Sequence, residues 1–335
     1  MNWLAWQDFI SSHPAFRCRQ LEKAVFQQLI TDWSEVTTLP SSDRQWLKDN
    51  CSLEIKAEIF SQKDEQAEKA RLELSDGQVI ETVLMRHSDG RRTVCLSSQV
   101  GCPLQCSFCS TGQLGFRRNL KAYEIVEQVL LWQRRLALVE EKVDNLVFMG
   151  MGEPLLNLAE VLKAIEIFHN PETLAIGWRH MAISTVGLVT EIKQLIKFGQ
   201  QIKLAWSLHA ADNRLRDRLM PINKRYNLEQ VKKAMLDYAQ ITNRRIMMEY
   251  LMLDGVNDNL IQAEKLADFL NDFPKNLIVV NLLTYNPGES DFRPSRASSR
   301  RDFINILKRR GYSVTERLSM GQDVVGACGQ LGQRN

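Results

Sequence analysis

The chain has 335 residues, of which 44% are hydrophobic and 25% are charged, and its formal net charge is +3 at pH 7. These proportions are typical of a soluble globular protein and exclude a disordered or fibrous chain. The slight positive excess permits an anionic partner without requiring one. The length allows a barrel of about 250 residues with an accessory domain, or two ordinary domains.

The first residues, MNWLAWQDFI, lack the basic and long apolar regions of a signal peptide, and Asp8 interrupts them. No stretch of the sequence is apolar over the length that a bilayer requires. We therefore expect a cytoplasmic protein with no membrane partner. In that reducing compartment, clustered cysteines more often bind metal or perform redox chemistry than form structural disulfides.

The first third of the chain is expected to contain two small units. Residues 1–60 are predicted to be helical, because Leu21, Val25 and Leu29 recur at helical spacing. Residues 61–92 are predicted to form a β-meander extension, since strand-like runs are separated by Asp-Gly turns. In the run VIETVLM, Glu81 interrupts an apolar face. A covered Glu81 would be a candidate proton acceptor, whereas an exposed glutamate on an edge strand is the alternative.

From residue 93 onward, apolar strand-like runs alternate with amphipathic helical runs, as in repeated parallel βα units. The predicted strands are 93–98, 145–149, 180–184, 202–208, 245–251 and 277–283, followed at the end by YSVTERL. The predicted helices are about 122–140, 157–169, 189–198, 228–241, 259–271 and 298–310. Six such units predict a partial barrel, and a doubly wound open sheet is the alternative.

Unusual residues follow the predicted strands at the ends where a barrel carries its active site. They are a cysteine loop after the first strand, GMGEP after the second, Ser184 at the end of the third, SLH (207–209) at the end of the fourth and Asn286 after the sixth. Parallel strands bring these ends to one rim. We therefore expect a single active site there.

Four of the seven cysteines lie within TVCLSSQVGCPLQCSFCSTG, residues 93–112. The spacing of Cys102, Cys106 and Cys109 lets three thiolates point toward a common centre. A structural zinc site normally has four ligands, so His87 or Cys95 would have to supply the fourth. Three cysteines can instead hold an iron–sulfur cluster with one iron open to a ligand. The spacing leaves both sites possible.

The CxxxCxxC loop resembles the signature of radical S-adenosylmethionine (radical SAM) enzymes, and longer stretches resemble the RlmN/Cfr family of RNA adenosine methyltransferases. These stretches are SSQVGC, CSFCSTG, GFRRNL, FMGMGEPL, SLHA, LMPINKRY, GVND and ACGQL. The resemblance implies an α/β fold in which residues 93–318 form a partial (β/α)6 TIM-like barrel of the radical SAM type. Residues 1–60 would be a small helical RNA-binding accessory domain, and residues 319–335 a tail with the methyl-carrying cysteine.

The resemblance also implies roles for individual residues. One [4Fe-4S] cluster would be held by Cys102, Cys106 and Cys109. Cys328 would carry the methyl group, Cys95 would release the product through a transient disulfide, and Glu81 would accept a proton. The residues expected to bind SAM are Gly152, Glu153, Ser184, Ser207, Leu208, His209 and Asn286. Cys18 and Cys51 have no motif context and are expected to be structural.

The implied activity is radical methylation of an adenosine ring carbon in 23S ribosomal RNA, with two SAM molecules consumed per turnover and transfer RNA as a further substrate. We favour C2 of adenine; C8, with antibiotic resistance as its consequence, is the alternative. A zinc-stabilised RNA-binding module without catalysis and a radical SAM enzyme with another substrate are also open. The resemblance implies a monomer and an electron donor such as flavodoxin.

A basic run near the C-terminus, RPSRASSRRDFINILKRRGYSVTER, is dense enough in arginine and lysine to neutralise RNA phosphates. The alternative is a solvated helix face. Arg117 and Arg118, close to the cysteine loop, would lie beside a substrate at the mouth of the barrel.

Overall fold

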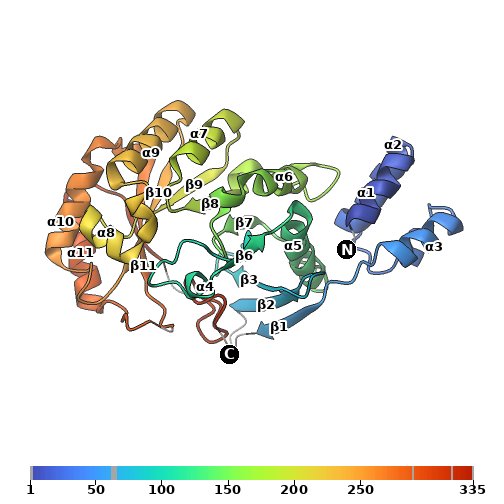
Figure 1. Cartoon of the computed structure of the whole chain (residues 1–335), viewed down its shortest axis with the longest axis horizontal. Coiled ribbons are helices and arrows are strands. Elements are labelled where there is room, and N and C mark those ends of the chain that lie inside the picture. Colours follow the sequence, from blue (N-terminus) through green and yellow to red (C-terminus); the bar gives the residue numbers. More distant parts are fainter. Residues whose placement is uncertain (1–2, 62–65, 289, 318–319, 334–335) are drawn as a thin grey trace.

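The computed structural model describes residues 3–61, 66–288, 290–317 and 320–333, and its main sheet has 10 strands (Figure 1). The parallel strands are β4 (Arg92–Cys95), β7 (Asn145–Phe148), β8 (Met181–Thr185), β9 (Lys203–Ser207), β10 (Ile246–Met252), β11 (Ile278–Thr284) and β12 (Val314–Arg317). They lie side by side in chain order. Every crossover therefore runs in the same direction, and the strand order never reverses as it does in a doubly wound sheet.

The crossovers are the predicted helices. They are α5 (Ala122–Ala137), α6 (Leu158–His169), α7 (Val189–Phe198), α9 (Leu228–Thr242), α10 (Leu260–Phe269) and α11 (Ala297–Arg309), which follow the outside of the curved strand row (Figure 1). The strands β1 and β12 form the two edges of the sheet, so the barrel does not close. The predicted partial barrel is confirmed. None of the described helices has the length and apolar character needed to cross a bilayer.

The core lies between this strand row and its helices. Strand residues such as Phe148, Ile183 and Val280 are buried because helices cover the outer face of the row. Helix α5 turns an apolar stripe inward, and its Trp132 is fully buried. The Trp132 indole donates to the Thr82 hydroxyl at 3.2 Å, which ties this helix to the meander.

The meander extends the sheet beyond β4 with antiparallel strands β3 (Val79–Arg86), β2 (Ala67–Glu73) and β1 (Ala57–Ser61). Sequence analysis did not identify β1, because AEIFS has no regular alternation of apolar and polar residues. This strand spans the domain boundary that was predicted at residue 60. Glu81 lies within β3 and is buried, so its face of the strand is covered.

The N-terminal region contains α1 (Trp3–Ser12), α2 (Ala15–Glu22) and α3 (Ser41–Asn50). Leu21 and Val25, which recur at helical spacing, are fully buried. Helix α5 holds this region through Arg134, whose guanidinium donates to the carbonyls of Leu53 and Ile30. Cys51 is buried in the N-terminal core, where burial raises the pKa of its thiol to about 11.

Candidate active site

The cysteine loop begins at β5 (Gln99–Gly101), a short strand that pairs with β6 (Phe116–Asn119), and ends at helix α4 (Ser110–Gln113). Cys102 and Cys106 are buried and Cys109 is half-buried. Burial raises the pKa of all three thiols, that of Cys102 to about 12, and the charges of the neighbouring cysteines raise the pKa of Cys106 further. The three sulfurs are therefore close enough to interact electrostatically in a dry site.

Three cysteine thiols in a largely buried loop are a donor set that an iron–sulfur cluster takes, with one iron left open to a ligand. Among the described residues, no three His, Cys, Asp or Glu side chains are placed to hold one metal ion. Neither residue considered as a fourth zinc ligand joins the group, because His87 bonds to the Thr93 hydroxyl at 3.0 Å and Cys95 interacts with Cys328.

The glycine-rich loop after β7 packs directly on the segment that leads into the cysteine loop. A Cβ at Gly150 would lie 2.7 Å from the Leu96 carbonyl oxygen. Gly152 has a φ of +94°, and a Cβ there would lie 2.5 Å from the Cβ of Gln99. Only glycine allows this approach. The loop then delivers Glu153 to the interior, where its backbone N–H donates to Gln99 Oε1 at 2.9 Å.

The Glu153 carboxylate links two strand ends. It accepts hydrogen bonds from the backbone N–H groups of Leu155 at 3.1 Å and Val186 at 3.0 Å. The side chain is buried, and burial raises the pKa of Glu153 to about 7. At neutral pH this carboxyl can therefore exist with or without its proton, and a nearby cation would stabilise its charged form.

A row of polar side chains crosses the inner face of the sheet from β8 to β12. Ser184 and Ser207 hydroxyls lie 3.2 Å apart, and the sheet register continues from Ser207 to Glu249, Asn281 and Thr315. The Asn281 amide donates to Glu249 Oε1 at 2.8 Å. Among the described residues, none provides a hydrogen bond to the buried Oε2 of Glu249. Sequence analysis missed Glu249 and Asn281, although polar residues within the apolar runs IMMEYLM and IVVNLLT were a usable signal.

His209 connects the end of β9 to the cysteine loop. Its Nδ1 accepts the Leu251 backbone N–H at 3.0 Å, so the ring proton must lie on Nε2. Burial lowers the pKa of His209 to about 3, which keeps the ring neutral. The ring meets Phe108 edge-on with centroids 5.0 Å apart. Its neighbour Leu208 is fully buried.

Arg216, which sequence analysis did not select, joins the loops of the rim. It lies on α8 (Asn213–Leu219) and is fully buried. Its guanidinium donates to the carbonyls of Val186, Ser207 and Leu208 and to the side chain of Asn223. Five donors in one planar group suit this task.

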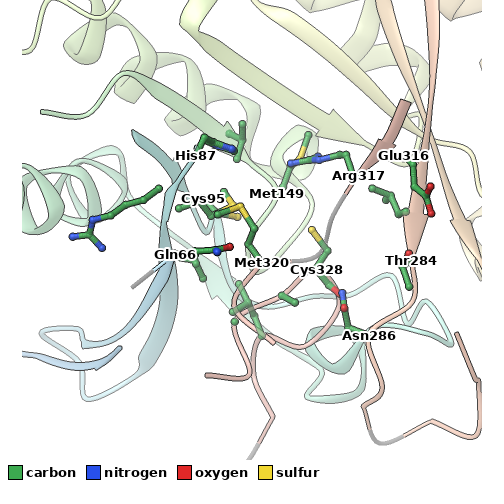
Figure 2. A pocket seen from close by; sticks show the side chains of 18 of the residues that line it. Gln66, His87, Cys95, Met149, Thr284, Asn286, Glu316, Arg317, Met320 and Cys328 are labelled. Carbon is green, nitrogen blue, oxygen red and sulfur yellow. The ribbon is translucent and has the colours of Figure 1, made fainter. Parts of the chain in front are cut away.

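A cavity of about 740 Å³ contains the two cysteines that the resemblance selected for reaction (Figure 2). Cys95 comes from β4 and Cys328 from the C-terminal tail, and Arg317 of β12 lines the same space. Burial raises the pKa of Cys95 to about 12, helped by the charge of Cys328 and opposed by Arg317. Asn286 donates to the Cys328 carbonyl at 3.1 Å, which positions the tail.

Glu81 lies outside that cavity. It lines a separate space of about 390 Å³ together with Leu114, Met151 and Gly332. Tail residues line both spaces, Cys328 and Leu331 the first and Gly332 and Gln333 the second. Helix α4 holds the tail there through bonds from the Ser110 N–H to the Gly329 carbonyl and from the Thr111 hydroxyl to the Leu331 carbonyl. In this conformation Glu81 therefore does not share a space with the two thiols.

Several basic residues of the predicted phosphate-binding run form ion pairs within the protein or line the cavity. Arg300 pairs with Glu316 at 2.6 Å, Arg310 pairs with Glu264 at 2.7 Å, and Arg317 lines the cavity. Arg118 likewise pairs with Asp76 and Glu124. The residues of the run that stay exposed on α11 are Arg301, Lys308 and Arg309.

Comparisons with known proteins agree with this geometry. The Radical SAM superfamily model matches residues 96–270. The chain is 42% identical over 330 residues to a probable dual-specificity RNA methyltransferase RlmN from Frankia casuarinae, covering 95% of this chain and 77% of that protein. It is 41% identical over 319 residues to the dual-specificity RNA methyltransferase RlmN from Alkalilimnicola ehrlichii, covering 94% and 87%. The crystal structure of a radical SAM methyltransferase from Sphaerobacter thermophilus is 38% identical, with a TM-score of 0.93 over 98% of this chain and 96% of that chain.

Proposed function

Because this chain belongs to the RlmN family of radical SAM methyltransferases, we propose that it methylates C2 of an adenosine in 23S ribosomal RNA. The observation that carries the proposal is the shared cavity of Cys95 and Cys328, which come from opposite ends of the catalytic region. Their proximity is what a disulfide-releasing mechanism needs. The relatives named dual-specificity enzymes support transfer RNA as a second substrate.

The superfamily implies a [4Fe-4S] cluster and SAM. We assign the cluster to Cys102, Cys106 and Cys109, whose thiols would lose their protons on binding. The residues proposed to surround SAM are Gly152, Glu153, Ser184, Ser207, Leu208, His209 and Asn286. When bound, the two groups would supply the methyl group and the one-electron chemistry that activates it, with two SAM molecules used per turnover.

Cys328 would act as the methyl carrier because direct transfer is chemically mismatched. The methyl group of SAM and the amidine carbon of adenine are both electrophilic, whereas a thiolate is nucleophilic. The Cys328 sulfur would accept the methyl group and later present it to the ring. The exposure of this side chain and the φ of +87° at Gly329 suit a residue that must face two partners in turn.

The other two side chains would complete the transfer. Glu81 would accept the proton lost from the ring carbon, and the adduct would at the same stage give up one electron, which the one-electron chemistry of the bound cluster can take back, so that the ring regains its aromaticity. Cys95 would then attack the Cys328 sulfur, so that a disulfide forms as the carbon–sulfur bond breaks and the released carbon takes up a proton. A thiol reductant would reduce this disulfide by thiol–disulfide exchange, so that both cysteines return to thiols and the reductant is oxidised to a disulfide.

We further propose a monomer that works in the cytoplasm with a flavodoxin-type electron donor. Family membership supports each of these assignments. The RNA-binding role of residues 1–60 and of the exposed basic residues on α11 is likewise a proposal.

Nucleoside mass spectrometry of ribosomal and transfer RNA tests the activity. Cells that lack such an enzyme should gain 2-methyladenosine when they express this chain, and should not gain it with Cys95→Ala or Cys328→Ala. Cys18→Ala is the matched control, because Cys18 lies in the N-terminal helices and donates to the Ile10 carbonyl. Formation of 8-methyladenosine would move the assignment to C8. Methylation that survives Cys328→Ala, or a colourless zinc-loaded protein that binds RNA without methylating it, would overturn the proposal.

A further inference from the structure

Lys69 is a fully buried lysine in β2. Its Nζ lies 3.2 Å from Glu81 Oε1 and 3.4 Å from the Val325 carbonyl oxygen in the tail. The ammonium also stands 5.4 Å from the centroid of the Phe60 ring. A buried ammonium needs such partners, because desolvation disfavours its charge.

Sheet packing does not require a cation at this position. The neighbours of Lys69 in β2 include the buried Ala67 and Ala70, and an apolar side chain of similar length would bury at lower cost than an ion pair. The exposed fractions of the Lys69 and Glu81 side chains are 0% and 5%. The charge of Lys69 therefore has a purpose other than filling the core.

The Glu81 carboxylate is held from two sides. Lys69 binds Oε1, whereas Oε2 accepts the backbone N–H of Gly332 at 2.7 Å. Both Gly332 and Val325 belong to the tail that carries Cys328. One buried ion pair thus contacts the tail on both sides of the methyl-carrying residue.

We propose that Lys69 is a positioning residue of the methyl-transfer reaction, placing the Glu81 carboxylate and the Cys328 tail relative to each other. This inference rests on the proposed function, in which Glu81 accepts the proton of the ring carbon. Lys69 itself lines neither the cavity of Cys95 and Cys328 nor the space beside Glu81. It acts through Glu81 Oε1 and the Val325 carbonyl.

These contacts explain how Glu81, the proposed proton acceptor, can first be covered by the tail and then be exposed when the tail moves. In this conformation Oε2 accepts the Gly332 N–H and Oε1 faces Lys69, so both carboxylate oxygens already have a partner. Movement of the tail at Gly332, whose φ is +90°, would open Oε2 toward the adjoining cavity. Lys69 would keep Oε1 in place meanwhile, and one proton could then transfer to Oε2.

The charged surroundings of Glu81 define the controls. Its cross-strand neighbour in β2 is Arg71, which lines the same cavity. The ion-pair partner of Arg71 is Glu58, with 3.9 Å between Arg71 Nη1 and Glu58 Oε2. The other described residues that line this cavity carry no charge; they are Val79, Leu114, Met151, Gly332 and Gln333. Arg71→Met therefore removes a nearby exposed cation without breaking the buried pair.

The test compares the two half-reactions in Lys69→Met, Lys69→Arg and Arg71→Met. Intact-protein mass spectrometry reports methylation of Cys328, and nucleoside analysis reports methylation of RNA. We expect Lys69→Met to methylate Cys328 but to slow RNA methylation by roughly tenfold or more. Lys69→Arg should restore RNA methylation, because it keeps a cation beside Glu81, and Arg71→Met should leave RNA methylation unchanged.

A double variant covers the case in which Lys69→Met does not fold. Lys69→Met with Glu81→Gln removes both buried charges, so no unpaired ion remains to prevent folding. Because Lys69 acts through Glu81, the double variant should methylate RNA as slowly as Glu81→Gln alone and should still methylate Cys328. RNA methylation at the wild-type rate in Lys69→Met, or a further slowing in the double variant relative to Glu81→Gln alone, would overturn the inference. An inactive wild-type protein would instead contradict the proposed function, so the two failures are distinguishable.

Discussion

The buried Arg216 allows the stability of the active-site rim to be predicted from its contacts. Replacing it with methionine keeps most of the side-chain volume and removes every donor. The carbonyls of Val186, Ser207 and Leu208 lose bonds of 2.7, 3.1 and 3.1 Å, and the Asn223 side chain loses one of 2.9 Å. These acceptors belong to three different loops, so no single adjustment can satisfy them again.

The magnitude follows from two opposing terms. The Leu208 carbonyl keeps the Ala210 N–H at 2.7 Å as a donor, so three acceptors lose their Arg216 bond without this replacement. At about 2 kcal/mol each, they cost about 6 kcal/mol. Burial lowers the pKa of Arg216 to about 10 from 12.5, so removal of the cation recovers about 3 kcal/mol of desolvation. The net loss in the free energy of unfolding is about 3 kcal/mol, and for a chain of this length we expect Tm to fall by roughly 6 °C.

Differential scanning calorimetry of the SAM-free protein measures this shift. Arg218→Met is the matched control, because Arg218 lies on the same helix with an exposed side chain. It should change stability by no more than about 0.5 kcal/mol. The Tm of Arg216→Lys should lie between those of Arg216→Met and Arg218→Met, since an ammonium keeps the charge but cannot reach all four acceptors. Equal Tm values for Arg216→Met and Arg218→Met would refute the reasoning.

Two further predictions concern the loop after β7. Burial raises the pKa of Glu153 to about 7 from 4.5, so the folded SAM-free protein binds this proton more tightly and loses up to about 3 kcal/mol as pH rises from 4.5 to 7. Glu153→Gln should remove that loss, and parallel Tm–pH curves for variant and wild type would contradict it. Gly152→Ala should weaken SAM binding at least about tenfold in calorimetric titration, because its Cβ would lie 2.5 Å from Gln99 Cβ and displace Glu153. The control is Gly115→Ala, because Gly115 also has a positive φ, +74°, but open space around its Cβ. Equal SAM affinities of Gly152→Ala and Gly115→Ala would contradict the steric explanation.

Local sequence patterns were enough to predict the catalytic half of the fold. The strands β7 to β12 and the helices α6, α7, α9, α10 and α11 match their predicted ranges closely, because each element has its own apolar period and its own turn residues. Helix α8 was not predicted. The same regularity predicted that Ser184, Ser207 and Asn286 would meet at one rim, since parallel strands place their ends together. The strand β1 escaped prediction because its five residues carry no such period.

Long-range packing settled what local patterns could not. Lys69 looks like an ordinary surface lysine in AEKARLE, and Arg317 looks like part of an RNA-binding run. Sheet register and the docked tail instead bury Lys69 against Glu81 and turn Arg317 toward Cys95 and Cys328. Glu81 and the two thiols line different cavities, and residues of the docked tail line both. Short sequence motifs indicate the type of chemistry, whereas the charge around each reacting group depends on segments that come into contact only after folding.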